Sequence, residues 1–303
     1  MRDPSPFHAG EQEAQERVGV REELETHGRR VIRDFMPEQH RRFFAQLPFL
    51  LVGSRDQRGQ PWSSVLAGPP GWLSSPDPRR LEVRARPVPG DVLEKNLAVG
   101  AELGLLGLEP TTRRRNRMNG VVEALDERGF TVAVRQSFGN CPKYIQARDV
   151  EYLGARPAAE ARRRDHLEGA LATLVEEADT FFLASAAPGP AGGVDVSHRG
   201  GRPGFVAIGE GGRVLTVPDY SGNFYFNTIG NLLVEPRAGL LFLDFQRGDT
   251  VQIAARAEVL WEGPEVDAVP GAERLLRFTI DEVVHRPAAL PLKWGPAQLS
   301  PFL

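Results

Sequence analysis

The sequence is poor in cysteine and in net charge, and each shortage excludes a class of protein. Cys141 is the single cysteine, so one chain forms no internal disulfide and builds no cysteine-rich zinc or iron–sulfur site. The 37 Lys and Arg residues nearly balance the 40 Asp and Glu residues, which leaves a formal charge of −3. Because nucleic-acid binding depends on a basic surface, this balance argues against a nucleic-acid partner.

Long apolar runs and nucleotide-binding motifs are also missing. No stretch approaches the roughly 18 apolar residues that a membrane span needs, and residues 1–10 lack the pattern of a signal peptide. We therefore expect a cytoplasmic protein with no membrane partner. There is no Walker A pattern and no G-x-G-x-x-G between a strand and a helix, so no P-loop or Rossmann site is expected. The histidines show no metal-ligand spacing, and we expect no metal site.

What the chain does contain is a repeat. Helical patterns cover residues 11–47, with an interruption at Pro37, and a second stretch that follows Pro157. A similar series of segments comes after each. Residues 59–73 match 192–206 at a shift of 133. Residues 96–109 match 231–244 at a shift of 135, with seven of fourteen residues identical. We interpret the chain as an internal duplication.

Each copy has the pattern of short β-strands separated by Gly, Pro and Asp. The expected strands are 49–53, 63–67, 80–85, 104–108 and 130–134 in the first copy, and 181–184, 204–208, 213–217, 239–244 and 250–257 in the second. Residues 227–234 predict a short helix between two of them. About six short antiparallel strands that must hide their edges close readily into a small barrel.

The second copy carries the clearest resemblance to a known family. Its segments GGRPGFVAI, RVLTVPDYSGN, FNTIGNLLVEPRAGLLFLDF and GDTVQIAARAEVL follow in the order strand, Pro-Asp loop, short helix, strand and closing strand. The chain thereby resembles the pyridoxamine 5′-phosphate oxidase-like FMN-binding split barrels over residues 49–150 and 181–262. The resemblance implies a mainly β (α+β) fold, with two tandem split β-barrels and flanking helices packed as an intrachain pseudo-dimer.

The expected division of the chain follows from the repeat and the resemblance. It comprises an N-terminal helical segment 1–47, a first barrel 48–155, a linking helix 156–180, a second barrel 181–265 and a C-terminal extension 266–303. The true pyridoxamine phosphate oxidases hold phosphate with an Arg-Lys pair after a loop that corresponds here to Asp219–Asn223. This sequence lacks that pair, so we expect either a different set of phosphate-binding residues or a different substrate.

In the first copy, RNRMNG resembles the strand that carries flavin-contacting amides in the family. Alternation along a strand places Arg115, Arg117 and Asn119 on one side and Asn116 on the other, and one of these sides can face a pocket. The alternative is a solvated, arginine-rich edge strand that resists aggregation.

The next segment, QSFGNCPKYIQ, resembles a post-barrel segment that approaches the flavin in several family members. Lys143 offers a compact charge, and Gly139-Asn140 can form a left-handed turn whose amides serve an anion. Cys141 is either a small buried packing residue or a thiol beside the flavin.

In the second copy, Ser197, His198 and Arg199 suit recognition of phosphate or carboxylate, or else they decorate the exit of a hairpin. Asn231 coincides with Asn96 of the first copy, which favours a role in bracing the short helix. Trp294 is expected to pack against a neighbouring strand, with stacking on a ligand ring as the alternative. The candidate cofactor-binding residues are Ser64, Arg115, Asn116, Arg117, Asn119, Cys141, Pro142, Lys143, Tyr144, Ser197, His198, Arg199, Asp219 and Asn223; no catalytic residue is assigned.

The resemblance implies an FMN-dependent oxidoreductase that acts on a small-molecule substrate, with the flavin in a cleft between the two copies. Divergence between the copies favours one flavin per chain. Since the chain has no cysteine cluster, an iron–sulfur or reductase partner would be a separate protein, and association into a homodimer stays open. The alternative is a non-catalytic protein that binds flavin, the deazaflavin F420 or haem, for which His198 is the candidate axial ligand.

Overall fold

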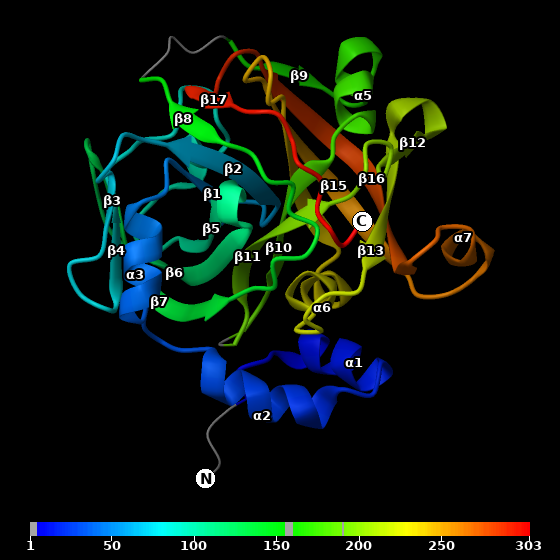
Figure 1. The fold of residues 1–303 in the computed structure, drawn as a ribbon, viewed down its shortest axis with the longest axis horizontal. Coiled ribbons are helices and arrows are strands. Elements are labelled where there is room, and N and C mark those ends of the chain that lie inside the picture. Colours follow the sequence, from blue (N-terminus) through cyan, green and yellow to red (C-terminus); the bar gives the residue numbers. More distant parts are fainter. Residues whose placement is uncertain (1–4, 155–159, 190) are drawn as a thin grey trace.

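The structure, a computed structural model, describes residues 5–154, 160–189 and 191–303. Two large antiparallel sheets lie side by side, with helices across one end of the pair (Figure 1). The first unit consists of β1 (Phe49–Arg55), β2 (Pro61–Ala67), β3 (Leu73–Ser74), β4 (Arg80–Val83), α4 (Leu93–Asn96), β5 (Glu102–Glu109), β6 (Arg114–Asp126) and β7 (Gly129–Gly139), with a 3₁₀ turn at Pro110–Thr112.

The second unit repeats this series element by element. It consists of β10 (Thr180–Ala187), β11 (Gly193–Gly200), β12 (Ala207–Gly209), β13 (Val214–Tyr220), α6 (Asn227–Val234), β14 (Arg237–Leu243), β15 (Thr250–Leu260) and β16 (Ala272–Arg286), with a 3₁₀ turn at Glu210–Gly212. The strand orders β2-β1-β5-β6-β7-β4-β3 and β11-β10-β14-β15-β16-β13-β12 are the same, position by position. The predicted mainly β fold of two tandem units is confirmed. Each sheet is an open path, because its two end strands do not pair with each other in the described part of the chain.

A pair of glycines lets the two units touch backbone to backbone. A Cβ on Gly104 of β5 would lie 2.5 Å from the carbonyl oxygen of Val194 in β11, and one on Gly239 of β14 would lie 2.4 Å from that of Pro61 in β2. These two glycines occupy the same place in their units, since Gly104 pairs with Gly53 in β1 and Gly239 with Ala184 in β10. The contact is therefore reciprocal, as in a two-fold dimer.

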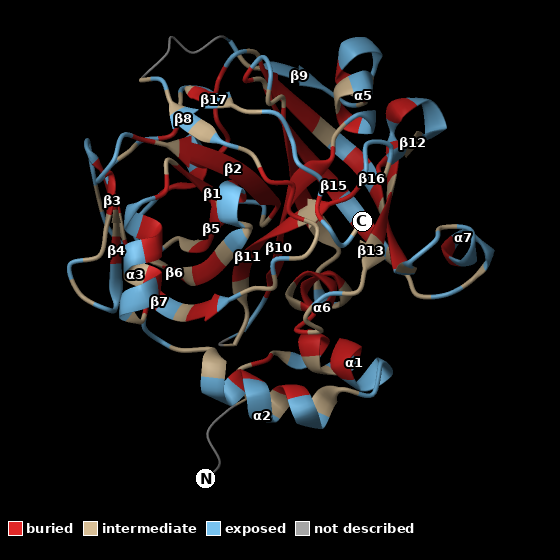
Figure 2. Cartoon of the chain, viewed as in Figure 1, coloured by how far each residue is buried: buried red, intermediate tan, exposed pale blue. Residues whose placement is uncertain are grey.

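Apolar side chains from both units fill the space around this contact. The shared core contains Leu51 and Leu106 from the first unit and Phe182, Val196 and Leu241 from the second. Each unit also has an apolar core of its own. Figure 2 shows that buried residues lie mainly on the strands of the two sheets. The two units consequently form one continuous body.

The predicted boundary of the second barrel at residue 265 is wrong. Strand β16 lies in the sheet between β15 and β13, so the second unit extends to Arg286. In the first unit Leu125 pairs with Phe130, five residues on, whereas the equivalent Leu260 pairs with Leu275, fifteen residues on. The connection before the last strand is longer in the second unit and contains α7 (Pro264–Asp267). The last strand therefore does not follow at the spacing that the repeat predicts.

The connections differ from the predicted linker and extension. The start of the predicted linking helix, within residues 155–159, lies outside the described residues. Beyond it, β9 (Arg162–Arg164) pairs with β16, and the helix α5 is limited to Gly169–Glu176. Near the C-terminus, β17 (Leu292–Trp294) pairs with β8 (Val150–Tyr152) of the first unit. The extension thus joins both units rather than forming a separate part.

The N-terminal arm, residues 5–47, bridges the two units with the predicted helices. They are α1 (Ala9–Arg17), α2 (Arg21–Val31) and α3 (Glu38–Ala45). Helix α1 packs closely on α6, because a Cβ on Gly10 would lie 2.2 Å from the carbonyl oxygen of Gly230. Arg33 then forms an isolated bridge with Ser137 of β7 in the first unit.

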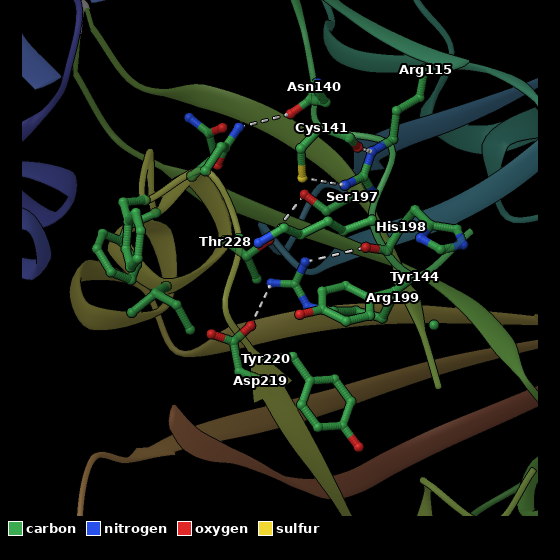
Figure 3. A pocket seen from close by; sticks show the side chains of 18 of the residues that line it. Arg115, Asn140, Cys141, Tyr144, Ser197, His198, Arg199, Asp219, Tyr220 and Thr228 are labelled. Atoms are coloured by element: carbon green, nitrogen blue, oxygen red, sulfur yellow. Dashed lines mark hydrogen bonds and ion pairs between the residues drawn. The ribbon is translucent and has the colours of Figure 1, made fainter. Parts of the chain in front are cut away.

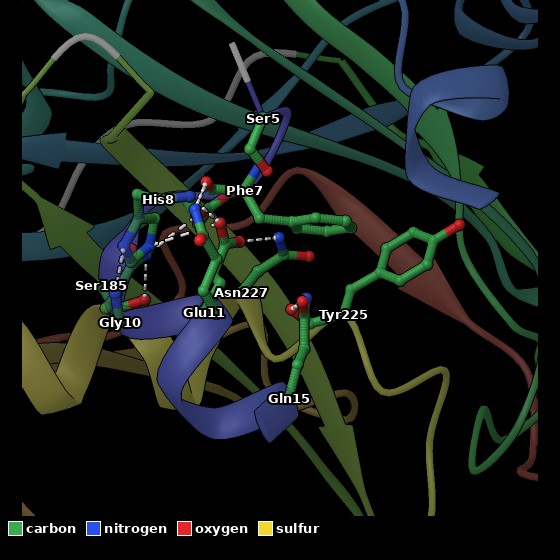
Figure 4. A network of polar contacts seen from close by, with 12 residues as sticks. Ser5, Phe7, His8, Gly10, Glu11, Gln15, Ser185, Tyr225 and Asn227 are labelled. Atoms are coloured by element: carbon green, nitrogen blue, oxygen red, sulfur yellow. Dashed lines mark hydrogen bonds and ion pairs between the residues drawn. The ribbon is translucent and has the colours of Figure 1, made fainter. Parts of the chain in front are cut away.

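Glu11 is a buried carboxyl group at the contact between the arm and α6 (Figure 4). Its Oε1 accepts a hydrogen bond from Asn227 Nδ2 at 2.5 Å, and its Oε2 accepts one from the backbone N–H of His8 at 2.9 Å. Burial, and then the nearby Asp195 carboxylate, raise the pKa of Glu11 to about 8. At neutral pH this side chain is therefore mostly protonated in the folded protein.

We predict that Glu11 makes stability fall as pH rises. Between its ordinary pKa and about 8 the folded state binds one more proton than the unfolded state, so the free energy of unfolding decreases by up to about 1.4 kcal/mol per pH unit. Replacing Glu11 with Gln removes this contribution. Chemical denaturation at pH 5, 6.5 and 8 measures it, with exposed Glu13→Gln on the same helix as the control. Equal pH dependence in the wild type and Glu11→Gln would contradict the assignment.

We also predict that Gly239→Ala destabilises the pair of units. The new Cβ meets the backbone of Pro61 and Trp62, which cannot move aside as a side chain can, so we expect a loss of about 1–3 kcal/mol. Gly209→Ala is the matched control, because a Cβ there meets nothing within 4 Å. Denaturant titration of both variants measures the difference, and a Gly239→Ala variant as stable as the control would refute the close contact.

Candidate functional site

A polar cleft lies between the units on one side of their contact (Figure 3). Strand β6 and the segment after β7 line it from the first unit, and β11, β13, the loop 218–226 and the first turn of α6 line it from the second. The space within the cleft, about 880 Å³, includes the open solvent at its mouth. Because both units contribute its walls, the cleft exists only in the assembled pair.

Arg117 is the residue that ties the two walls together. Its guanidinium donates to Asp195 Oδ1 at 2.8 Å and to Ser197 Oγ at 2.5 Å, both on β11 of the other unit. Asn119 Nδ2, two residues along β6, donates to the same Asp195 oxygen at 2.7 Å. The ion pair is buried on both sides, so removing either partner would leave an uncompensated charge.

Asn231 of α6 supports this pair from the second unit. Its Nδ2 donates to Asp195 Oδ2 at 2.8 Å and to Ser185 Oγ at 3.0 Å. In the first unit the equivalent Asn96 donates to Ser54 Oγ, also at 3.0 Å. Both asparagines therefore attach the short helix to the first strand of their unit, which is the bracing role that their coincidence in the sequence indicated.

Arg115 also points into the cleft, but it meets no carboxylate. Its Nε donates to the Cys141 carbonyl oxygen at 2.7 Å, and its Nη2 lies 3.3 Å from Cys141 Sγ. No ion pair to Arg115 occurs within the part of the chain that the structure describes. Burial lowers the pKa of Arg115 below its ordinary value, which marks a charge that would gain from an anionic partner.

Arg199 and Arg274 share one carboxylate on the opposite wall. Asp219 Oδ1 lies 3.4 Å from Arg199 Nη2, and Asp219 Oδ2 lies 3.6 Å from Arg274 Nε. Arg274 also pairs with Glu273. Burial lowers the pKa of Arg199, and Asp219 opposes that shift. Two guanidinium groups are thus only partly neutralised at this wall.

His198 is buried, and its imidazole ring makes no hydrogen bond within the described residues. Neither ring nitrogen has a partner, and the ring meets Phe182 edge-on with centroids 5.9 Å apart. Burial, followed by repulsion from Arg115 and Arg199, lowers the pKa of His198 well below 6.5. The imidazole is therefore neutral at pH 7 and offers one donor and one acceptor.

The segment after β7 forms the remaining wall. Tyr144 donates from its hydroxyl to the Ser221 carbonyl oxygen at 3.0 Å, and Lys143 Nζ lies 3.4 Å from the same oxygen. The left-handed residue of this segment is Tyr144, with a φ of 65°, and neither Gly139 nor Asn140 is left-handed, contrary to prediction. The turn is therefore placed by side-chain contacts across the units and not by a glycine.

Ten of the fourteen predicted site residues line this cleft. They are Arg115, Arg117, Cys141, Lys143, Tyr144, Ser197, His198, Arg199, Asp219 and Asn223. No strand was expected over Ser197, His198 and Arg199, but these residues lie within β11.

Four predicted residues lie elsewhere. Asn119 contacts Asp195 beneath the cleft, and Asn116 points to the other side of β6, where its side-chain oxygen is near Gly139. Pro142 does not belong to the lining, although its neighbours do. Ser64 lies on β2, at the pseudo-symmetric position of Ser197.

The cleft lining also contains residues that the sequence did not predict: Arg274, Thr228 and the aromatic pair Phe224 and Phe226. Arg274 lies on β16, within the predicted C-terminal extension 266–303. A last strand in the second copy, equivalent to β7 in the first, is the signal that identifies it. Trp294 lies outside the cleft lining and packs between Phe49 and Phe245, with centroids 5.1 and 4.9 Å away, as expected.

The pseudo-symmetric second cleft is filled by side chains. Gln252 replaces Arg117 at the equivalent position and donates to Ser64 Oγ at 2.9 Å. Asp91 accepts a hydrogen bond from Ser64 at 2.6 Å and pairs with Arg286, and both charged side chains are 1% exposed. Trp62 packs against Val284 beside them. In this second region the Asp91–Arg286 ion pair fills the space that is open to a ligand in the first cleft.

Several buried polar atoms of the open cleft have no hydrogen-bond partner within the described residues. They are Arg117 Nε, Arg199 Nε, Arg274 Nε and Nη1, Asn140 Nδ2 and both ring nitrogens of His198. Buried donors are normally satisfied, and charged donors cost the most when they are not. These residues consequently fit a ligand that is rich in hydrogen-bond acceptors and carries negative charge.

Comparison with known proteins places the second unit in a family. Residues 167–288 match the family model described as pyridoxamine 5′-phosphate oxidase. No curated protein matches the chain. No helix in the described ranges is long and apolar enough to cross a membrane.

Solved structures that resemble the chain are related to it only remotely. A FAD-binding protein from Mesorhizobium loti is 17% identical, covers 42% of this chain and 97% of its own, and has a TM-score of 0.30. A putative pyridoxamine 5′-phosphate oxidase from Lactobacillus delbrueckii is 16% identical, covers 40% and 94%, and has a TM-score of 0.31. An FMN-binding protein from Syntrophomonas wolfei is 11% identical, covers 38% and 81%, and has a TM-score of 0.29.

The family match covers α5 and the strands β10 to β16, the elements that supply β11, β13 and the first turn of α6 to the cleft. The second unit of the chain is therefore similar to the pyridoxamine 5′-phosphate oxidase family, whose model matches residues 167–288.

Proposed function

We propose that the chain binds one FMN in the cleft between its units and uses it as an oxidoreductase on a small organic molecule. The observation that carries the proposal is the group of buried and half-buried cationic side chains that lack full neutralisation. Five cationic residues line the cleft: Arg115, Arg117, Lys143, Arg199 and Arg274. Three carboxylates face them, which are Asp219 and Glu273 in the lining and Asp195 beneath Arg117. An excess of two positive charges matches the charge of a phosphate monoester.

Within this group, Arg115 and Arg199 are the residues best suited to hold the phosphate. Arg115 meets only a carbonyl oxygen and a thiol, and Arg199 shares Asp219 with a second arginine. Arg117 is less available, because Asp195 and Ser197 already occupy its Nη atoms. The planar guanidinium of an arginine can donate two parallel hydrogen bonds to one phosphate.

Aromatic side chains offer a surface for the isoalloxazine ring. Tyr144 and Tyr220 lie with ring centroids 5.3 Å apart and planes tilted by 35°. They belong to different units, so the ring surface, like the cation cluster, needs both. Phe224 and Phe226 extend the apolar lining beyond Tyr220. Flat ligands stack favourably on such faces.

When bound, FMN would supply the hydride chemistry at its N5 position, and the protein would orient the ring and limit access of water. The neutral His198 can hold a hydrogen bond at the cleft wall in either direction, because its two ring nitrogens differ in role. Cys141 presents its thiol beside Arg115. The side chain of Asp219 keeps Arg199 oriented toward the cleft.

A single flavin per chain follows from the difference between the two clefts. In the second cleft Gln252 stands in place of Arg117 and the Asp91–Arg286 pair provides its own charge balance. An anionic ligand there would have to displace a buried ion pair, which would leave Asp91 uncompensated.

A non-catalytic protein that carries flavin, F420 or haem is the second candidate. The observation that favours haem is the neutral, unpartnered imidazole of His198 at the cleft, since neutral histidine is a common axial ligand of haem iron. Absorbance separates these candidates, because flavins and haem differ in their visible bands.

We predict that the purified protein binds FMN with a stoichiometry of about one per chain. Absorbance from 300 to 700 nm, with mass spectrometry of the released ligand and titration of the apoprotein, measures this. A Soret band would favour haem instead, and a mass matching F420 would replace FMN. Failure to bind FMN, F420 or haem would overturn the proposal.

We predict that Arg115→Gln weakens FMN binding by roughly 10- to 100-fold, because a hydrogen bond between charged groups contributes about 1.5–3 kcal/mol. Arg115→Lys should retain part of the affinity, since it keeps the charge but loses the planar fork. Arg135→Gln is the matched control, because Arg135 on β7 is exposed and pairs with Glu102 away from the cleft. Fluorescence titration measures the affinities, and equal values for Arg115→Gln and the control would exclude Arg115 from the site.

A further inference from the structure

Tyr144 is held in an unfavourable backbone conformation at the edge of the cleft. Its φ of 65° lies in the left-handed region, which costs a residue with a bulky side chain free energy. Such residues persist only where their surroundings hold them, and they gather at functional sites. The contacts that hold Tyr144 in this conformation are therefore needed to keep the shape of the cleft.

The C-terminal segment, residues 298–303, supplies the contact to the Tyr144 backbone. Ser300 is 4% exposed, and its Oγ accepts a hydrogen bond from the Tyr144 N–H at 3.2 Å. The Ser300 N–H in turn donates to Gln146 Oε1 at 2.7 Å. Ser300 is thus connected to the residues on both sides of Ile145 by side-chain hydrogen bonds.

Further contacts fix the C-terminal segment itself. Ala147 and Gln298 exchange backbone hydrogen bonds of 2.9 Å in both directions. Arg113 donates to the carbonyl oxygens of Gln298 and Leu299 at 3.3 and 3.2 Å. Arg202 of the second unit donates to the Leu303 oxygen at 3.0 Å. The segment is therefore attached to both units.

The second unit packs closely against the backbone of Tyr144. A Cβ on Gly200 would lie 2.1 Å from the Tyr144 carbonyl oxygen, so the backbone of Tyr144 rests directly on the end of β11. The Tyr144 hydroxyl reaches Ser221, and its ring faces Tyr220. Together with the hydrogen bond from its N–H to Ser300, these contacts fix the backbone, the ring and the hydroxyl group of Tyr144.

We propose that Ser300 is a positioning residue of the flavin cleft. It holds Tyr144 in the left-handed conformation, so that the Tyr144 ring joins Tyr220 in an aromatic wall against which the flavin ring lies. This inference rests on the proposed function for its ligand. It adds that the C-terminal segment, which contributes no residue to the cleft lining, determines how the flavin ring is held.

We predict that Ser300→Ala weakens FMN binding roughly three- to tenfold, the effect of one neutral hydrogen bond. Stacked tyrosines quench flavin fluorescence, so the bound FMN should also become more fluorescent. Ser300→Thr keeps the hydroxyl and should restore both values. Ser74→Ala is the matched control, because its hydroxyl contacts Glu82 in the first unit, outside the cleft.

Hydrogen–deuterium exchange of the apoprotein provides a readout without ligand. Residues 140–147 should exchange faster in Ser300→Ala than in the wild type, while the two cores exchange alike. A variant that loses thermal stability but keeps wild-type flavin fluorescence and affinity would reduce Ser300 to a structural role and overturn the inference. Unchanged exchange of residues 140–147, or no rescue by Ser300→Thr, would do the same. If the wild type binds no FMN, the proposed function fails, and the exchange experiment still decides whether Ser300 holds Tyr144.

Discussion

The buried ion pair between Arg117 and Asp195 is the interaction on which the rest of the structure depends. It joins β6 of one unit to β11 of the other, and Asn119, Asn231 and Ser197 complete its hydrogen bonds. A buried ion pair is worth little by itself, since desolvation offsets the attraction, but it is costly to break. Its effect is therefore to fix the register of the two units, and with it the walls of the cleft.

The two-fold repeat determines the overall arrangement of the two units. The differences between the units determine which of the two equivalent clefts is open. Gly104 and Gly239 make the contact between the units reciprocal, so two equivalent clefts arise. In one cleft Arg117 leaves room for a ligand, whereas in the other the Asp91–Arg286 pair fills the space. The same architecture thus gives one open, cationic cleft and one closed, internally neutral region.

The segments outside the repeat are arranged around the open cleft. The N-terminal arm places Glu11 against Asn227, one of the residues that line it, and the C-terminal segment places Ser300 against Tyr144. Both contacts lie on elements without a counterpart in the other half of the chain. A duplicated fold acquires a single specialised site most directly through such additions, because a change within the repeat must also satisfy the shared contact.

The sequence by itself determined the repeat, the mainly β class, the position of α6 and ten of the residues that line the cleft. These features follow from local patterns and from motifs that stayed intact in the second copy. It did not reveal β16 or Arg274, since the longer connection after Leu260 disrupted the repeat. Only the tertiary structure decided that Ser64 faces a closed region and Ser197 an open one. That distinction depends on Asp91 and Arg286, which lie 195 positions apart and meet only when the two units pack together.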